Sequence, residues 1–139
     1  MNRIELSLPT KHDYVSLARL TIASVANNMG FSIGDVEDLK VAVSEACANA
    51  ISFSMTTETT YDLTYSVGEK DLTITVKDTG EGFEPDMLLK RPDNIGDPLG
   101  SGFGLFIIKS LMDNVEIVSE KGIGTSITMV KNLPTVYKM

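Results

Sequence analysis

Two runs of alternating apolar and polar residues, joined by a short polar turn, constrain the fold of this chain most. Residues 61–67 and 72–76 each place their apolar side chains two positions apart, with Gly68 to Asp71 between the runs. Because the side chains of a strand point alternately to its two faces, this pattern predicts a β-hairpin with one buried face.

Asp78 occupies the next inward position after the second of these strands, where the pattern calls for an apolar residue. A lone carboxylate in a core is destabilising unless hydrogen-bonding partners meet it. Gly80 and Gly82 follow, and glycines allow a backbone or a ligand to come close. Taken alone, the segment fits either a turn cap at a strand end or one wall of a binding site.

Length and composition restrict the class of protein. At 139 residues, 42% of them hydrophobic, the chain is expected to form one domain, residues 1–139, with its own core. A net charge of −7 argues against direct nonspecific binding to nucleic acid, which depends on basic patches. We expect no membrane contact, because no apolar run approaches the ~20 residues of a membrane span. The single cysteine, Cys47, cannot form an internal disulfide, which favours a cytoplasmic location.

The remaining elements follow from periodicity. Further strands are predicted for residues 2–8, 115–119 and 125–130, and helices for residues 13–30, 34–53 and 103–112. Asp13 is the expected N-cap of the first helix, and Gly30 its end. Residues 79–101 lack periodicity and contain three prolines, as is typical of a functional or mobile loop. The order of elements predicts an α+β fold, with helices on one face of an antiparallel or mixed sheet.

Glu45 and Asn49 stand out in the second predicted helix. They are four residues apart and therefore share one helix face. The residues around them are small and apolar, so these polar side chains lie either on a narrow solvated stripe or in a pocket. In isolation, both explanations stand.

Two further features are individually weak. Gly100-Ser101-Gly102-Phe103-Gly104 comes just before a helix, where backbone N–H groups suit an anion such as phosphate. It matches neither a P-loop nor a dinucleotide-binding motif. Thr125 is a polar residue on the inward face of the last strand, and it could equally be a core hydroxyl with a local partner.

Taken together, these features suggest one Mg-ATP site without a P-loop. Asp78 and Thr125 can read the polar edge of a planar base, and the glycine-rich turn can hold a polyphosphate. Asn49 can bind Mg²⁺, which prefers oxygen ligands. Glu45 could orient or deprotonate an attacking hydroxyl.

The order of these motifs resembles the GHKL ATPase superfamily. The order is Glu45…Asn49, Asp78-x-Gly80-x-Gly82, the glycine cluster of residues 100–104, and Gly122-x-Gly124-Thr125. Within that superfamily the chain is most similar to bacterial anti-sigma factor serine kinases of the RsbW and SpoIIAB type, and more to the RsbW branch. The similarity also covers residues 14–20, 36–47, 104–113 and 126–131.

The resemblance implies a fold, a function and partners. The fold is the two-layer Bergerat sandwich, a mixed, mostly antiparallel sheet with helices on one face and a mobile ATP lid. The function is that of an anti-sigma factor, a serine/threonine-protein kinase that sequesters a sigma factor and uses ATP and Mg²⁺ to phosphorylate a serine of its antagonist. That antagonist is an anti-anti-sigma protein of the STAS type, and a homodimer in a bacterial cytoplasm is expected.

The resemblance also implies residue roles. Glu45 matches the catalytic base, and Asn49 matches the Mg²⁺ ligand. Asp78 matches the carboxylate that reads adenine, with Thr125 as a second adenine-side contact. The remaining positions that match nucleotide-binding residues are glycines and their neighbours: Gly80, Gly82, Gly100, Ser101, Gly102, Phe103 and Gly104.

Two positions depart from the family pattern. Phe53 stands where these kinases usually carry a histidine, and no arginine comes just before Gly100, where the nearest basic residues are Lys90 and Arg91. Cationic groups stabilise a transferring phosphoryl group, so their absence could slow transfer. The alternative function is therefore a nucleotide-gated sigma-binding module with little or no kinase activity.

Overall fold

The part of the chain that the structure describes forms one five-stranded sheet with its helices on one face. The computed structural model describes residues 2–54, 59–82 and 101–134. The strands lie in the order β1-β2-β3-β5-β4, and each of the four pairings within the described residues is antiparallel. Their bounds are β1 Asn2–Pro9, β2 Thr60–Val67, β3 Asp71–Asp78, β4 Asn114–Glu120 and β5 Gly124–Asn132. The antiparallel form of the expected α+β sheet is thus the one adopted.

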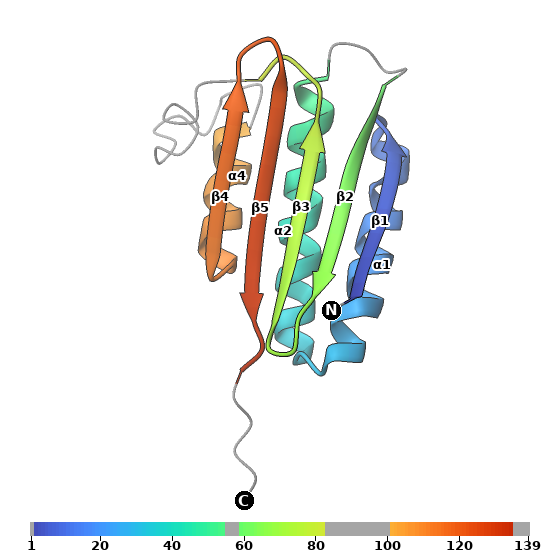
Figure 1. Ribbon diagram of the computed structural model, residues 1–139, viewed down its shortest axis with the longest axis vertical. Helices are drawn as coiled ribbons and strands as arrows, with labels where there is room; N and C mark the ends of the chain where they lie inside the picture. The colour runs from blue at the N-terminus through green and yellow to red at the C-terminus, as the bar shows by residue number, and fades with distance from the viewer. Residues whose placement is uncertain (1, 55–58, 83–100, 135–139) are drawn as a thin grey trace, which may run out of the picture.

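The helices form the second layer. Figure 1 shows α1 (Val15–Met29), α2 (Ile33–Ser52) and α4 (Ser101–Leu111) side by side behind the sheet, with α2 in the middle. This confirms the two-layer α+β prediction. One sheet face is covered because the strands alternate: in β3, Leu72, Ile74 and Val76 are buried against the helices.

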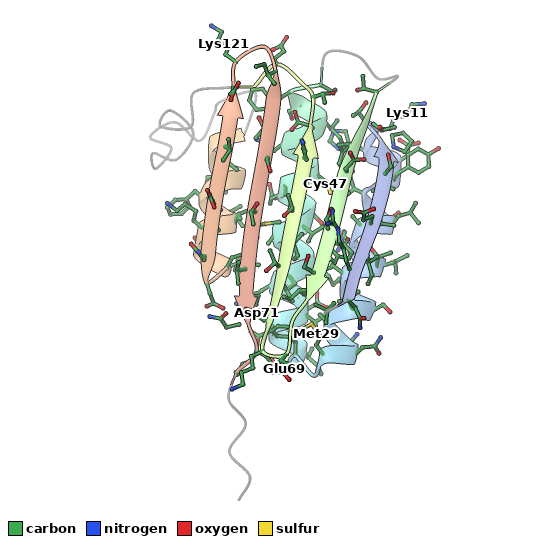
Figure 2. The ribbon with its side chains drawn as sticks, in the orientation of Figure 1. Lys11, Met29, Cys47, Glu69, Asp71 and Lys121 are labelled. Carbon is green, nitrogen blue, oxygen red and sulfur yellow. The ribbon has the colours of Figure 1, made fainter. Side chains whose placement is uncertain are left out.

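The core between the two layers is formed by small and apolar side chains. Small residues of α2, including Ala42, Ala46 and Ala50, are fully buried and let the helix lie close to the sheet. Cys47, labelled in Figure 2, belongs to the same buried set and is unpaired. Burial raises the pKa of its thiol to about 11, an effect that the neighbouring Tyr61 hydroxyl partly opposes, so the thiol is neutral and poorly reactive at neutral pH.

The boundaries of α1 and α2 show which capping predictions were right. Gly30 adopts the left-handed conformation (φ 95°) at the C-terminus of α1, as expected. Asp13 was wrong as an N-cap, because it lies inside a short 3₁₀ turn, His12–Tyr14, that precedes α1. The cap that the sequence analysis missed is Ser32, whose Oγ accepts a hydrogen bond from the Asp35 backbone N–H at 3.1 Å.

Four chain segments meet at one end of the molecule. In Figure 1 the C-terminal end of α2, the end of β3, the β4–β5 turn and the start of α4 all lie at the top. Lys121, labelled in Figure 2, lies on that turn, whereas Glu69 and Asp71 lie at the opposite end. The antiparallel topology therefore brings together the segments that carry the predicted site residues. No helix within the described part of the chain has the length and apolar character to cross a membrane.

Candidate functional site

A row of three polar side chains crosses the buried face of the sheet at this end. Asp78 of β3 pairs directly with Thr125 of β5, and Thr125 pairs with Ser119 of β4. Asp78 and Thr125 are only 5% and 2% exposed. The hydroxyls of Thr125 and Ser119 lie 2.8 Å apart and form a hydrogen bond. The predicted proximity of Asp78 and Thr125 is thus present in the sheet register.

The Asp78 carboxylate is held by backbone N–H groups of the chain. Its Oδ1 accepts a hydrogen bond from the Gly80 backbone N–H at 2.9 Å. Burial raises the pKa of Asp78 above its ordinary value, while the backbone N–H groups of Gly80 and Thr125 act in the opposite direction. A carboxylate in this state gains stability from any further donor that reaches it, as the amino group of a base would.

The turn-cap and binding-wall explanations of Asp78 are therefore not exclusive. The bond to Gly80 N–H is the local turn bond that the cap explanation requires. That bond uses Oδ1 of the carboxylate. Asp78 is also buried and pairs with Thr125 in the sheet, and a plain surface cap would lack both features.

Asn49 is the most conspicuous unpaired polar group nearby. It is only 4% exposed, and neither the nitrogen nor the oxygen of its amide has a hydrogen-bond partner among the described residues. A buried amide without partners is destabilising by an amount comparable to a lost hydrogen bond. Such an orphaned oxygen fits a hard cation or a nucleotide-bound water, so the donor set is compatible with Mg²⁺.

Glu45 lies one helical turn before Asn49 on the same side of α2. Its side chain is half-buried, between solvent and the start of α4. Gly104, in the first turns of α4, lies directly beside the Glu45 carboxylate. The solvated-stripe explanation therefore fails for Asn49, which is buried, and holds in part for Glu45.

The glycines after Asp78 lie close to the backbone of other segments of the chain. A Cβ on Gly80 would collide with the Phe53 carbonyl, and a Cβ on Gly82 with the Glu120 carbonyl. Gly82 also has a positive φ of 69°. At these two positions the chain's own backbone makes a close approach, which is one of the two possibilities that the sequence left open.

These contacts join three segments around the site. The Glu81 N–H donates to the Phe53 carbonyl at 2.8 Å, and the Glu81 carbonyl accepts from the Gly122 N–H. Phe53 is the C-cap of α2, and its own N–H donates to the Asn49 carbonyl at 3.1 Å. The end of α2, the segment after β3 and the β4–β5 turn are therefore fixed to one another by backbone hydrogen bonds.

Some predicted residues lie beyond this description. Gly100, Lys90 and Arg91, with most of the expected lid, fall outside the described residues. Ser101 and Gly102 form the first turn of α4, and Phe103 is about half exposed on it.

Ser119 is the functional candidate that sequence reasoning missed. It follows Val115 and Ile117 on the inward face of β4, as Asp78 follows apolar residues on β3 and as Thr125 precedes them on β5. The same signal, a polar residue continuing an inward apolar register, would have found it.

Comparison with known proteins places this geometry in context. The family described as histidine kinase-like ATPase domain matches residues 8–131. The chain is similar to the serine-protein kinase RsbW of Oceanobacillus iheyensis, with 39% identity over 128 residues that cover 86% of this chain and 81% of that protein. It is also 35% identical to serine-protein kinase RsbW of Bacillus thuringiensis (strain Al Hakam) over 133 residues, 91% of this chain and 83% of the relative.

One solved structure shares the fold. The crystal structure of the RsbU and RsbW domains of Rv1364c from Mycobacterium tuberculosis superimposes with a TM-score of 0.72 at 15% sequence identity. The match covers 100% of this chain and 35% of that one, so the chain spans about a third of that larger protein's length.

Proposed function

Because this chain belongs to the histidine kinase-like ATPase family, and within it to the serine-protein kinases of the RsbW type, we propose that it is an ATP-dependent anti-sigma factor kinase. It sequesters a sigma factor and transfers phosphate to a serine of a STAS-type anti-anti-sigma protein. The observation that carries the proposal is the buried, orphaned Asn49 amide at the same end of the molecule as buried Asp78 and Thr125.

The proposed site divides its work between two ends of a nucleotide. The Asp78 carboxylate accepts a hydrogen bond from the amino group of adenine, with Thr125 and the Ser119 hydroxyl beside it. The Asn49 side-chain oxygen would hold Mg²⁺, which when bound neutralises charge on the phosphates. The start of α4, with Gly102 and Gly104, lies where the phosphates are received.

Glu45 is the proposed general base. Its carboxylate takes the proton from the attacking serine hydroxyl of the protein substrate as the new O–P bond forms and the bond to the leaving ADP breaks. The partial exposure of Glu45 supports this role, because a base must be reached by a hydroxyl that arrives on another protein.

The transfer experiment tests the proposal. The wild-type chain is incubated with radiolabelled Mg-ATP and a STAS-type antagonist, and the phosphorylated residue is located by mass spectrometry. Glu45→Gln should lower the transfer rate at least ~100-fold, the scale of a general base, and leave ATP binding intact. Glu37→Gln is the matched control, because Glu37 is an exposed carboxylate of the same helix, paired with Lys40.

Two results would contradict parts of the proposal. Full transfer by Glu45→Gln would remove the base assignment. Saturable ATP binding and sigma capture without phosphoserine after long incubation would favour the nucleotide-gated binding module. Phe53 and the lack of an arginine just before Gly100 are the sequence features that suggested this alternative.

The edge of the sheet supports a proposed homodimer. β1 pairs only with β2 within the described part of the chain, so one side of its backbone is open. Leu17 and Leu20 of α1, three residues apart, are 45% and 68% exposed near this edge. A second copy would cover both features. Sedimentation of wild type and Leu20→Glu tests this: the variant should shift toward the monomer.

A further inference from the structure

The buried side of α4 lacks a side chain at its first position. Gly104, Ile108 and Met112, the last of which directly follows α4, lie at intervals of four residues and are all buried. This spacing places them on one helix face, where an apolar side chain would be expected at residue 104 as well. A glycine also destabilises a helix relative to alanine, so its presence here calls for a local reason.

The Glu45 carboxylate occupies the space that this side chain would fill. A Cβ on Gly104 would lie 2.7 Å from Glu45 Oε2, a separation that Cβ atoms do not tolerate. It would be 3.7 Å from Glu45 Cδ and 3.8 Å from Glu45 Cβ, which are ordinary contacts. Only the carboxylate oxygen would therefore have to move.

This environment differs from that of Gly80 and Gly82. At Gly80 and Gly82, the obstructing atoms are backbone carbonyls of Phe53 and Glu120, which cannot turn away. At Gly104 the obstructing atom ends a flexible side chain. A methyl group at residue 104 would thus redirect the carboxylate with little effect on the fold.

We propose that Gly104 is a positioning residue for Glu45: its missing side chain keeps free the space from which the carboxylate acts as base. This rests on the proposed function, in which Glu45 takes the proton of the attacking hydroxyl. A displaced base loses reach, and general base catalysis requires hydrogen-bond distance to the hydroxyl.

A positioning role for Gly104 can be distinguished from a phosphate contact at the same residue. If Gly104 served only to let phosphate approach the backbone, Gly104→Ala would weaken ATP binding and leave the chemical step less affected. If it positions Glu45, the same variant lowers kcat and leaves ATP affinity in place.

The test compares Gly104→Ala with Gly34→Ala. Both are helical glycines near a helix start, but a Cβ on Gly34 would meet only Ser32 Oγ, at 3.9 Å. Gly104→Ala should lower kcat at least tenfold, with the Kd for ATP within twofold and Tm unchanged. Gly34→Ala should leave all three as in wild type.

A double variant and NMR spectroscopy give two independent readouts. Glu45→Asp shortens the side chain by one methylene, so it should lower kcat in the wild-type background and cause no further loss beside Gly104→Ala. In the nucleotide-free, ¹³C-glutamate-labelled protein, the Glu45 carboxyl resonance, assigned by its loss in Glu45→Gln, should shift in Gly104→Ala and stay in Gly34→Ala.

Three results would overturn the inference: an unmoved carboxyl resonance, a kcat for Gly104→Ala within twofold of wild type, or a tenfold loss of ATP affinity. Failure of the proposed function gives a different result: the wild type would be inactive, or Glu45→Gln would be active. In either case the carboxyl resonance would still report whether Gly104→Ala moves the Glu45 carboxylate.

Discussion

In the proposed function, Asp78 serves both the fold and a ligand. Its Gly80 bond closes the turn after β3, and its burial beside Thr125 removes the carboxylate from water. Folding therefore disfavours the charged form, which is the form that would accept a hydrogen bond from adenine. Asp78 is therefore expected to lower the stability of the nucleotide-free protein and to raise the stability of the nucleotide complex.

The first prediction concerns the stability of Asp78→Asn. Because the pKa of Asp78 is raised in the folded state, the folded state binds a proton more readily than the unfolded state. The contribution of this group to stability therefore falls as pH rises from the unfolded pKa through the folded pKa. The asparagine keeps an oxygen for the Gly80 N–H and carries no charge. Without nucleotide at pH 7, Asp78→Asn should be at least as stable as wild type.

Urea denaturation between pH 4 and pH 7 measures this directly. The wild type should lose stability relative to Asp78→Asn as the pH rises across this range. A variant that is less stable than wild type by more than about 1 kcal/mol at pH 7, the worth of one ordinary hydrogen bond, would contradict the account.

The second prediction concerns the residues at the N-termini of α1 and α2. Ser32→Ala removes the Oγ that accepts from the Asp35 N–H, so it should lower the free energy of unfolding by about 1 kcal/mol. Asp13 makes no side-chain cap bond to α1, whose N-cap position is Tyr14. Asp13→Ala should therefore stay within about 0.5 kcal/mol of wild type. Chemical denaturation checks both, and equal losses would show that the capping assignment is wrong.

The junction of α2, β3 and the β4–β5 turn makes a third prediction. In Gly80→Ala, the new methyl group would collide with the Phe53 carbonyl, so two backbone segments must separate. Such overpacking should lower the free energy of unfolding by about 2 kcal/mol or more. Gly34→Ala, whose new Cβ would make only an ordinary contact with Ser32 Oγ, should be neutral or slightly stabilising. If both variants melt at the wild-type temperature, the backbone contact at Gly80 is not as tight as described.

Periodicity explains which elements could be predicted. The strands and helices could be read from alternation and from 3.6-residue spacing, because burial on one side selects those periods. The α1 start could not, because both Asp13 and Tyr14 are compatible with a helix N-terminus and only packing decides. The contact of Gly80 with Phe53 joins residues 27 positions apart, and no local pattern carries such information.

At the scale of the whole molecule, the antiparallel topology assembles the site. It brings Asp78, Thr125 and Ser119 into one row although they belong to three strands, and it places the end of α2 at the same end of the sheet. Asp78 and Thr125 could be predicted because each breaks an apolar alternation. Ser119 gives the same signal, but the sequence analysis did not identify it, because serine is common at strand ends.

The family assignment explains the two-layer architecture, and the resemblance of the motif order predicted it correctly. The roles of Glu45, Asn49, Asp78 and Thr125 stay predictions. The burial of Asn49, Asp78 and Thr125 is what a nucleotide site needs, and the test must therefore ask whether Asp78 reads the base.

The most direct measurement compares ATP with inosine triphosphate by isothermal titration calorimetry, for wild type and Asp78→Asn. Inosine carries an oxygen where adenine carries its amino group, so it offers Asp78 no donor at that position. A site built around that donor should bind ATP at least ~100-fold more tightly, because the analogue leaves a buried carboxylate without its partner. In Asp78→Asn the amide can turn its N–H₂ toward inosine, and the preference should fall below about threefold. Equal affinities in wild type, or a preference unchanged by the substitution, would contradict the assignment of Asp78 as the residue that reads adenine.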